Sequence, residues 1–179
     1  ICITPAGITV RVDNLGSGHS WPSGAAQDRR AWVELTVYGA GDTILFESGK
    51  VPDGMDPEQI GDPNLFGFWE LTFKADNTPA HFFWEIDRVD STQLLTGPIT
   101  LDKTDPAFDH SQTKIYPAPG LHNTAVRAEA RVRIRALPYE VIDSLIASGD
   151  LAASVRSQLQ TLEVKGTIKT WLQSTRDPV

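Results

Sequence analysis

The stretch VRAEARVRIR, residues 126–135, alternates small or apolar side chains with charged ones. Successive side chains of a β-strand point to opposite faces of the sheet, so this pattern predicts one buried and one solvated face. A shift of one residue in the pairing would bury the arginines, and the pattern therefore sets the register. We expect a long central strand from Val126 to Ile134. Its even-numbered side chains are buried, and its odd-numbered ones form ion pairs across the sheet.

Several other segments show the same two-residue period, with turn-forming Gly, Pro, Asn and Asp between them. The strands expected from this pattern cover residues 8–13, 31–38, 44–46, 66–74 and 81–89, a short piece near Ile99, and a last strand over 162–172 that is interrupted near Gly166. Many short strands separated by turns are typical of an antiparallel β-sandwich of the immunoglobulin-like or jelly-roll type.

Helical signals are confined to one late segment. Pro138 suits the first turn of a helix, and Gly149 can end it. The apolar side chains that would share one helix face are Val141, Ile142, Leu145 and Ile146. Asp150 could cap a second helix that reaches Leu159. We therefore expect a mainly β fold with a short helical hairpin before the last strand.

The length and composition limit the class of protein. We assign residues 1–179 to a single β-sandwich domain, and because the chain starts with Ile1 and has no signal peptide, we expect it to be a piece of a longer chain. A net charge of −7 argues against a non-specific nucleic-acid binder. No apolar run approaches the length of a transmembrane helix. The single cysteine, Cys2, can form neither an internal disulfide nor a Cys-x-x-Cys-His haem attachment.

Signatures of catalysis are weak in this sequence. Nucleophile-elbow, phosphate-loop and dinucleotide motifs are all missing, so an enzyme is not the favoured interpretation. The four histidines, which are His19, His81, His110 and His122, show no paired metal-ligand spacing. The carboxylates of Asp102, Asp105 and Asp109 lie in one loop, where they could supply oxygen ligands to calcium. The other interpretation of this loop is an acidic segment exposed to solvent.

The tryptophans leave two interpretations open. Trp21, Trp32, Trp69 and Trp84 could form a platform that stacks on sugar rings. Trp69 and Trp84 follow apolar neighbours, which favours core packing for both. A stand-alone extracellular binding module, for carbohydrate or for protein, is therefore the second functional interpretation, and nothing in the sequence selects its ligand.

Two segments resemble a pattern found in multihaem c-type cytochromes. The first, residues 12–49, has the form N-x-x-x-GH-x-x-P-[ST]-G, followed by a strand containing Arg and Trp and then by F-x-SG. It includes Asn14, His19 and Gly49. The second, residues 128–139, resembles a long strand that runs into a proline and a helix. In those cytochromes both segments belong to a haem-free β-domain that follows the haem-bearing segment.

This resemblance implies a function for the chain. It would be a non-catalytic β-sandwich domain of an exported, periplasmic or extracellular multihaem cytochrome, which supports electron transfer by packing on haems or by docking partners. Haem c would be carried by an upstream segment or by a cytochrome partner. His19 would be a candidate axial ligand. The candidate contacts with haem or partner are Trp21, Arg127, Arg131 and Arg133. The alternative for His19 is structural, with both ring nitrogens bonded inside the turn.

Overall fold

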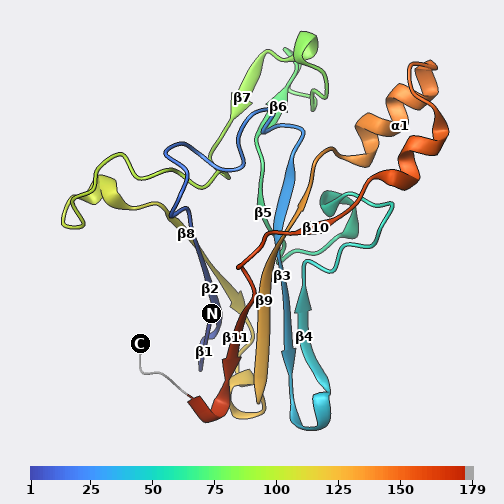
Figure 1. The fold of residues 1–179 in the computed structure, drawn as a ribbon. Helices are drawn as coiled ribbons and strands as arrows, with labels where there is room; N and C mark the ends of the chain where they lie inside the picture. The colour runs from blue at the N-terminus through green and yellow to red at the C-terminus, as the bar shows by residue number, and fades with distance from the viewer. Residues whose placement is uncertain (176–179) are drawn as a thin grey trace.

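The computed structural model describes residues 1–175 and consists mainly of antiparallel strands (Figure 1). The smaller main sheet has the order β1-β2-β8, with β1 at Cys2–Thr4, β2 at Gly7–Asp13 and β8 at Ser111–Pro117. The larger sheet has the order β10-β9-β3-β4, with β10 at Leu162–Glu163, β9 at Arg127–Arg135, β3 at Arg30–Tyr38 and β4 at Ile44–Ser48. The predicted β-sandwich class is confirmed.

Four short strands and several helical turns complete the fold. Strand β5 at Phe66–Phe68 pairs with β3, β11 at Lys169–Leu172 pairs with β9, and β6 at Leu71–Phe73 pairs with β7 at Arg88–Asp90. The 3-10 helices are η1 Ala40–Asp42, η2 Pro57–Ile60, η3 Phe83–Glu85, η4 Pro106–Phe108, η5 Leu121–Asn123, η6 Ala153–Gln158 and η7 Gln173–Thr175. Within residues 1–175, no helix combines the length and the hydropathy needed to cross a bilayer.

The alternating segment forms the centre of the larger sheet. Strand β9 pairs along its whole length with β3, from Arg127 opposite Tyr38 to Arg135 opposite Arg30. Ala128, Ala130 and Val132 are buried, and Ile134 packs partly buried against the core, as the pattern predicted. Val126 precedes the strand and is exposed, which corrects the expectation for that end.

The core lies between the two sheets. Ile8 and Val10 of β2 and Tyr116 of β8 belong to the same buried cluster as Val33 and Leu35 of β3. Removing an aliphatic side chain of this size from water stabilises the fold by about 1.5–3 kcal/mol. The cluster therefore holds the smaller sheet against the larger one.

Strand β8 was not predicted from the sequence, and the strand expected near Ile99 is not formed. Ile99 lies in a loop with an exposed side chain. The half-buried face of β8 carries Gln112 and Lys114 beside buried Tyr116, so polar residues hide its period. Residues 66–74 divide between β5 and β6, and residues 81–89 contain the turn η3 and only the start of β7.

The helical segment contains one α-helix rather than two. Helix α1 covers Tyr139–Ser148, buries Val141 and Ile142, and ends at Gly149 with φ 85°. Asp150 does not cap a second helix: its amide donates to the Leu145 carbonyl and completes the end of α1. The following turn, η6, is a 3-10 helix. Helix α1 and the β6–β7 extension lie at the end of the sandwich opposite the β3–β4 turn (Figure 1).

The hydroxyl of Tyr116 leads to a first testable prediction. Its side chain is fully buried, burial raises its pKa, and its oxygen has no hydrogen-bond partner within residues 1–175. An unsatisfied buried hydroxyl costs about 1–3 kcal/mol. Tyr116→Phe is therefore expected to maintain the free energy of unfolding or raise it by about 1 kcal/mol in urea denaturation. As a comparison, Tyr116→Ala removes the ring and lowers it by about 3–5 kcal/mol. A clear loss of stability in the Phe variant would show that the hydroxyl is satisfied.

Candidate functional site

The loop between β2 and β3 is held together by Asn14. This side chain is buried; its amide nitrogen lies 2.9 Å from the carbonyl oxygen of His19 and 3.3 Å from that of Leu95. Its side-chain oxygen accepts from the backbone nitrogen and the hydroxyl of Ser17, at 3.2 and 2.5 Å. Gly97 packs so closely on the loop that a Cβ there would lie 2.7 Å from the His19 nitrogen. The backbone of the His19 loop is therefore fixed from two sides.

The imidazole of His19 is exposed at the surface of this fixed loop. Its Nδ1 lies 3.0 Å from the carbonyl oxygen of Ser20, which assigns the proton to Nδ1. Within residues 1–175, no hydrogen bond to Nε2 is found. The lone pair of Nε2 is therefore not used by any hydrogen bond of the loop. This arrangement does not match the structural alternative, in which both ring nitrogens were expected to be bonded inside the turn.

Trp21 anchors the loop to the sandwich. Its backbone forms two hydrogen bonds with Leu95, at 2.8 and 2.9 Å, and its ring lies 6.2 Å from the ring of Phe68. The peptide bond to Pro22 is cis, and Pro22 is buried. Trp21 follows His19 by two residues. It is half-buried, so part of it is exposed to solvent.

The candidate arginines of β9 form an ion-pair network. Arg127 pairs with Asp42 and Glu129, and the hydrogen bond to Asp42 raises the pKa of Arg127. Arg131 contacts Glu34 at 3.5 Å, as Arg133 does at 3.3 Å. Each of these three arginine side chains is 28% exposed. No hydrogen bond or ion pair joins them to the His19 loop in residues 1–175, so cross-strand pairing is the role that their contacts show.

The alternation predicted that Arg135, like the other odd-numbered residues of β9, lies on the solvated face. The structure corrects this expectation. Arg135 is fully buried, its Nη1 lies 3.3 Å from Oδ1 of Asp56, and it donates to the Met55 carbonyl at 2.7 Å. Its guanidinium also lies over the rings of Trp32 and Tyr139. The strand continues its alternation, but the 55–56 loop and helix α1 cover this end of the sheet. The burial of Arg135 therefore results from the segments that pack on this end of β9.

The acidic loop proposed for calcium has no metal-binding arrangement among the described residues. Asp102 accepts from the backbone and the hydroxyl of Thr104, which lower the pKa of its carboxyl. Asp109 does the same with Ser111, and Asp105 accepts from the backbone of Ala107. Each carboxylate therefore stabilises its own turn. No group of three or more metal-ligating side chains is found within residues 1–175.

A cavity with several charged lining residues, which the sequence did not reveal, lies beside helix α1. It has a volume of about 260 Å³, and the buried guanidinium of Arg30 reaches Glu58 at 2.5 Å and Glu140 at 3.7 Å. His81 lies 3.2 Å from Glu140. Burial raises the pKa of Asp28 and of Glu140, against the opposing effect of Arg30 and His81. The chain brings these groups from widely separated segments, so no local spacing could have signalled the cavity. The contacts of Glu140 with Arg30 and His81 join α1 to β3 and to the β6–β7 extension.

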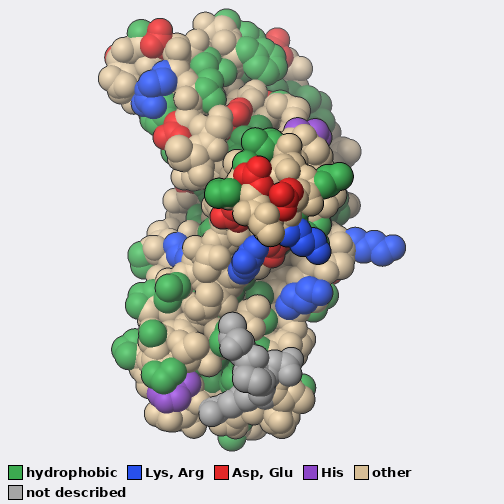
Figure 2. All heavy atoms as spheres, turned by 90° about the vertical axis from the view of Figure 1, so that its left-hand side faces the viewer, with side chains coloured by type: hydrophobic (Ala, Val, Ile, Leu, Met, Phe, Trp, Pro, Cys, Tyr) green, Lys and Arg blue, Asp and Glu red, His purple; other side chains and the backbone are tan. Residues whose placement is uncertain are grey.

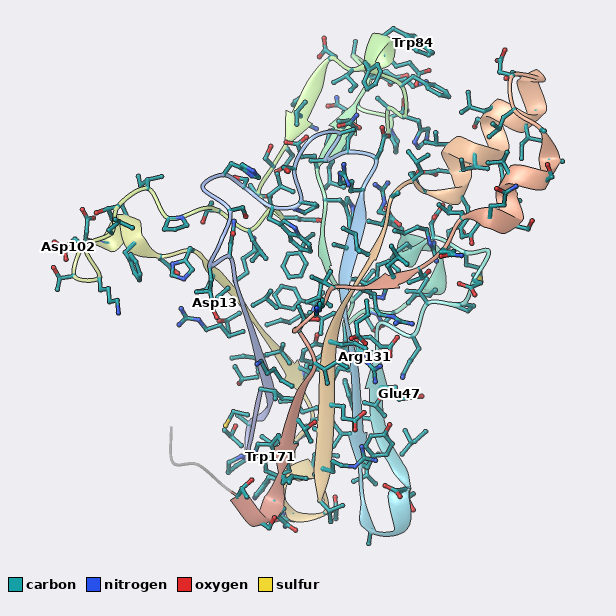
Figure 3. The ribbon with its side chains drawn as sticks, in the orientation of Figure 1. Asp13, Glu47, Trp84, Asp102, Arg131 and Trp171 are labelled. Carbon is teal, nitrogen blue, oxygen red and sulfur yellow. The ribbon has the colours of Figure 1, made fainter. Side chains whose placement is uncertain are left out.

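Core packing was expected for both Trp69 and Trp84, and the structure bears this out for only one of them. Trp69 is buried in the core, but Trp84 is 78% exposed at the tip of the β6–β7 extension (Figure 3). Its ring stacks on that of Phe82 with centroids 4.8 Å apart and planes 2° from parallel. The apolar neighbours of Trp84 form this exposed tip rather than a core. The binding-module interpretation rests on this feature of the structure.

Comparisons with known proteins address the fold. No family model matches the sequence, and no curated protein matches it. A penta-haem cytochrome c552 from Thermochromatium tepidum matches in structure, with a TM-score of 0.58 and 15% sequence identity. The fold of this chain is similar to that of part of a penta-haem cytochrome. The match covers 92% of this chain and 35% of the cytochrome, so the chain spans about a third of that protein's length. At this identity the similarity shows a shared fold.

Proposed function

We propose that this chain is a haem-free β-sandwich domain of an exported multihaem cytochrome, and that His19 is an axial ligand to a haem carried elsewhere. The exposed imidazole of His19 is the observation that carries the proposal, because its Nε2 has no role within the described fold. The structural similarity to part of a penta-haem cytochrome c552 and the sequence pattern around His19 support it.

Several other residues of the pattern have structural tasks. Asn14 fixes the loop, as described above. Trp32 donates from Nε1 to the Gly49 carbonyl at 3.0 Å, and the Ser48 hydroxyl donates to Asp62 at 2.7 Å. Among the described residues, the exposed ring of His19 makes one hydrogen bond, through Nδ1, and none through Nε2. A residue that contributes little to the fold but lies on a rigid loop is a candidate for binding.

The chemistry of His19 fits an axial ligand. A neutral imidazole binds iron through one nitrogen, and a hydrogen bond from the other nitrogen fixes the ring and raises its basicity. The Ser20 carbonyl takes that second role for Nδ1. A bound haem supplies one-electron redox chemistry. This chain holds the ligand on a preorganised loop, which limits the conformational entropy lost on ligation. Trp21 belongs to the same loop, and its half-buried side chain would contact the bound haem.

The proposal also assigns the partner and the location of the chain. The haem is bound covalently by another segment or by a cytochrome partner, since this sequence contains no Cys-x-x-Cys-His. Multihaem c-type cytochromes act outside the cytoplasm, so we place the domain in the periplasm or at the cell exterior. Arg127, Arg131 and Arg133 pair with carboxylates of this chain, and in the proposal they contact the haem-bearing partner at the edge of this network.

The variant His19→Ala in the haem-bearing protein tests the proposal. We expect one haem to change from low spin to high spin, which magnetic circular dichroism detects, because the iron loses a strong-field nitrogen ligand. The melting temperature of residues 1–179 should change little, because the side chain makes a single exposed hydrogen bond. Ser23→Ala, an exposed change in the same loop, is the control. If every haem remains low-spin and the domain melts several degrees earlier, the ligand role is wrong.

A further inference from the structure

Strand β2 has a backbone edge that is half unpaired. Strand β1 pairs only with its first residues, from Gly7 opposite Thr4 to Thr9 opposite Cys2. Strand β8 pairs with all of β2 on the other side, as far as Asp13. Within residues 1–175, no other backbone segment hydrogen-bonds to the side of Val10–Asp13 that faces away from β8. An unpaired strand edge of this kind is a template for another extended chain.

A groove runs along this open edge. It has a volume of about 300 Å³ and lies between β2, strand β9 and residues 165–169, which lead into the start of β11. The labels of Asp13 and Arg131 in Figure 3 mark β2 and β9, the strands on its two sides. The apolar part of its lining includes Val10 and Val12 of β2, Val33 of β3 and Val132 of β9. The groove therefore combines an apolar lining with free backbone groups on one wall.

The rim of the groove is basic in an otherwise acidic chain. Lys165 and Lys169 line it, are exposed, and have no ion pair within residues 1–175. Arg11 and Arg131 also line it, each of them already paired with carboxylates of this chain. Figure 2 views the molecule from the left-hand side of Figure 1. It shows Lys and Arg side chains gathered at mid-height, below a group of acidic side chains. Two unpaired ammonium groups beside an apolar groove favour a ligand that is both extended and negatively charged.

We propose that an extended peptide segment with acidic side chains binds in this groove as an added strand against β2. The open edge supplies main-chain hydrogen bonds over Val10–Asp13, which at about 3.4 Å per residue is a length of about 14 Å. Apolar side chains of the peptide enter the groove, and its acidic side chains lie close enough to the rim for the ammonium groups of Lys165 and Lys169 to reach them. A nucleic acid or a lipid would satisfy the charges but could not continue the sheet ladder.

Three synthetic peptides separate the contributions to binding. The probe is acetyl-TVEVEVT-amide, titrated into residues 1–179 by calorimetry. The second peptide carries N-methyl groups at alternate positions, which remove half of its main-chain donors. The third replaces both glutamates by lysine. We expect the acidic probe to bind, and each of the other two to bind at least about tenfold more weakly. Hydrogen exchange at Val10–Asp13 should slow when the acidic probe is added.

Charge-reversal variants test the rim. The double change Lys165→Glu with Lys169→Glu is expected to weaken the acidic probe by about tenfold. Lys165→Glu alone is compared with Lys103→Glu, which changes the net charge equally at an exposed site outside the groove lining. Failure of the acidic probe to bind at millimolar concentration overturns the proposal. So does equal weakening by Lys103→Glu and Lys165→Glu, or binding that N-methylation leaves unchanged. The test involves no haem, so its outcome is independent of the role of His19.

Discussion

Replacing Asp56 by alanine is expected to lower the free energy of unfolding by about 3–5 kcal/mol. The carboxylate of Asp56 is the only acidic partner that the described structure offers to the fully buried guanidinium of Arg135. The same carboxylate accepts from the amides of Tyr139 and Glu140 at 2.8 and 3.0 Å, at the start of helix α1. Its removal leaves a buried charge without its counter-ion and the helix without its cap.

Urea denaturation followed by circular dichroism measures this loss. Asp53→Ala is the matched control, since Asp53 lies in the same loop but is exposed, and its contact with Thr161 is long at 3.5 Å. Changes at such a surface site usually stay within about 0.5 kcal/mol. Adding Arg135→Met to Asp56→Ala should recover part of the loss, because no buried charge then remains. A cost for Asp56→Ala no larger than that of Asp53→Ala would contradict the assignment.

Replacing Gly49 by alanine is expected to cost at least about 3 kcal/mol. Gly49 has φ 69°, a conformation that costs other residues about 1–2 kcal/mol. A Cβ at this position would also lie 2.1 Å from the Val33 carbonyl oxygen, on strand β3 at the centre of the larger sheet. Moving Gly49 away would break the hydrogen bond from Trp32 Nε1 to its carbonyl.

Gly41→Ala separates the two causes of this loss. Gly41 has nearly the same φ, 66°, but a Cβ there meets nothing within 4 Å. Its substitution should therefore cost only the conformational term, about 1–2 kcal/mol. Melting temperature and the emission spectrum of the tryptophans report both variants, and a change of emission is expected for Gly49→Ala because Trp32 loses its hydrogen bond. Equal losses in the two variants would show that the close approach to Val33 is relieved without cost.

The local pattern of side chains was sufficient to predict the central strand β9 and helix α1, but not β8. The alternation over residues 126–135 determined the place and register of β9, because a one-residue shift would have buried several charges. Pro138 and Gly149 marked the limits of α1 through backbone chemistry that acts within one turn. The sequence around His19 also identified the loop as a candidate site, and the structure then showed that its imidazole is accessible.

The tertiary structure alone decided which faces and edges are covered. Arg135 follows the same alternation as Arg133, yet it is buried, because the loop carrying Asp56 packs on that end of the sheet. Trp84 has apolar neighbours, yet it is exposed, because the β6–β7 extension projects from the sandwich. The open edge of β2 depends on how far β1 extends along it. Period and turn chemistry act over a few residues, whereas burial and strand pairing depend on segments that are distant in the chain and meet only in the folded protein.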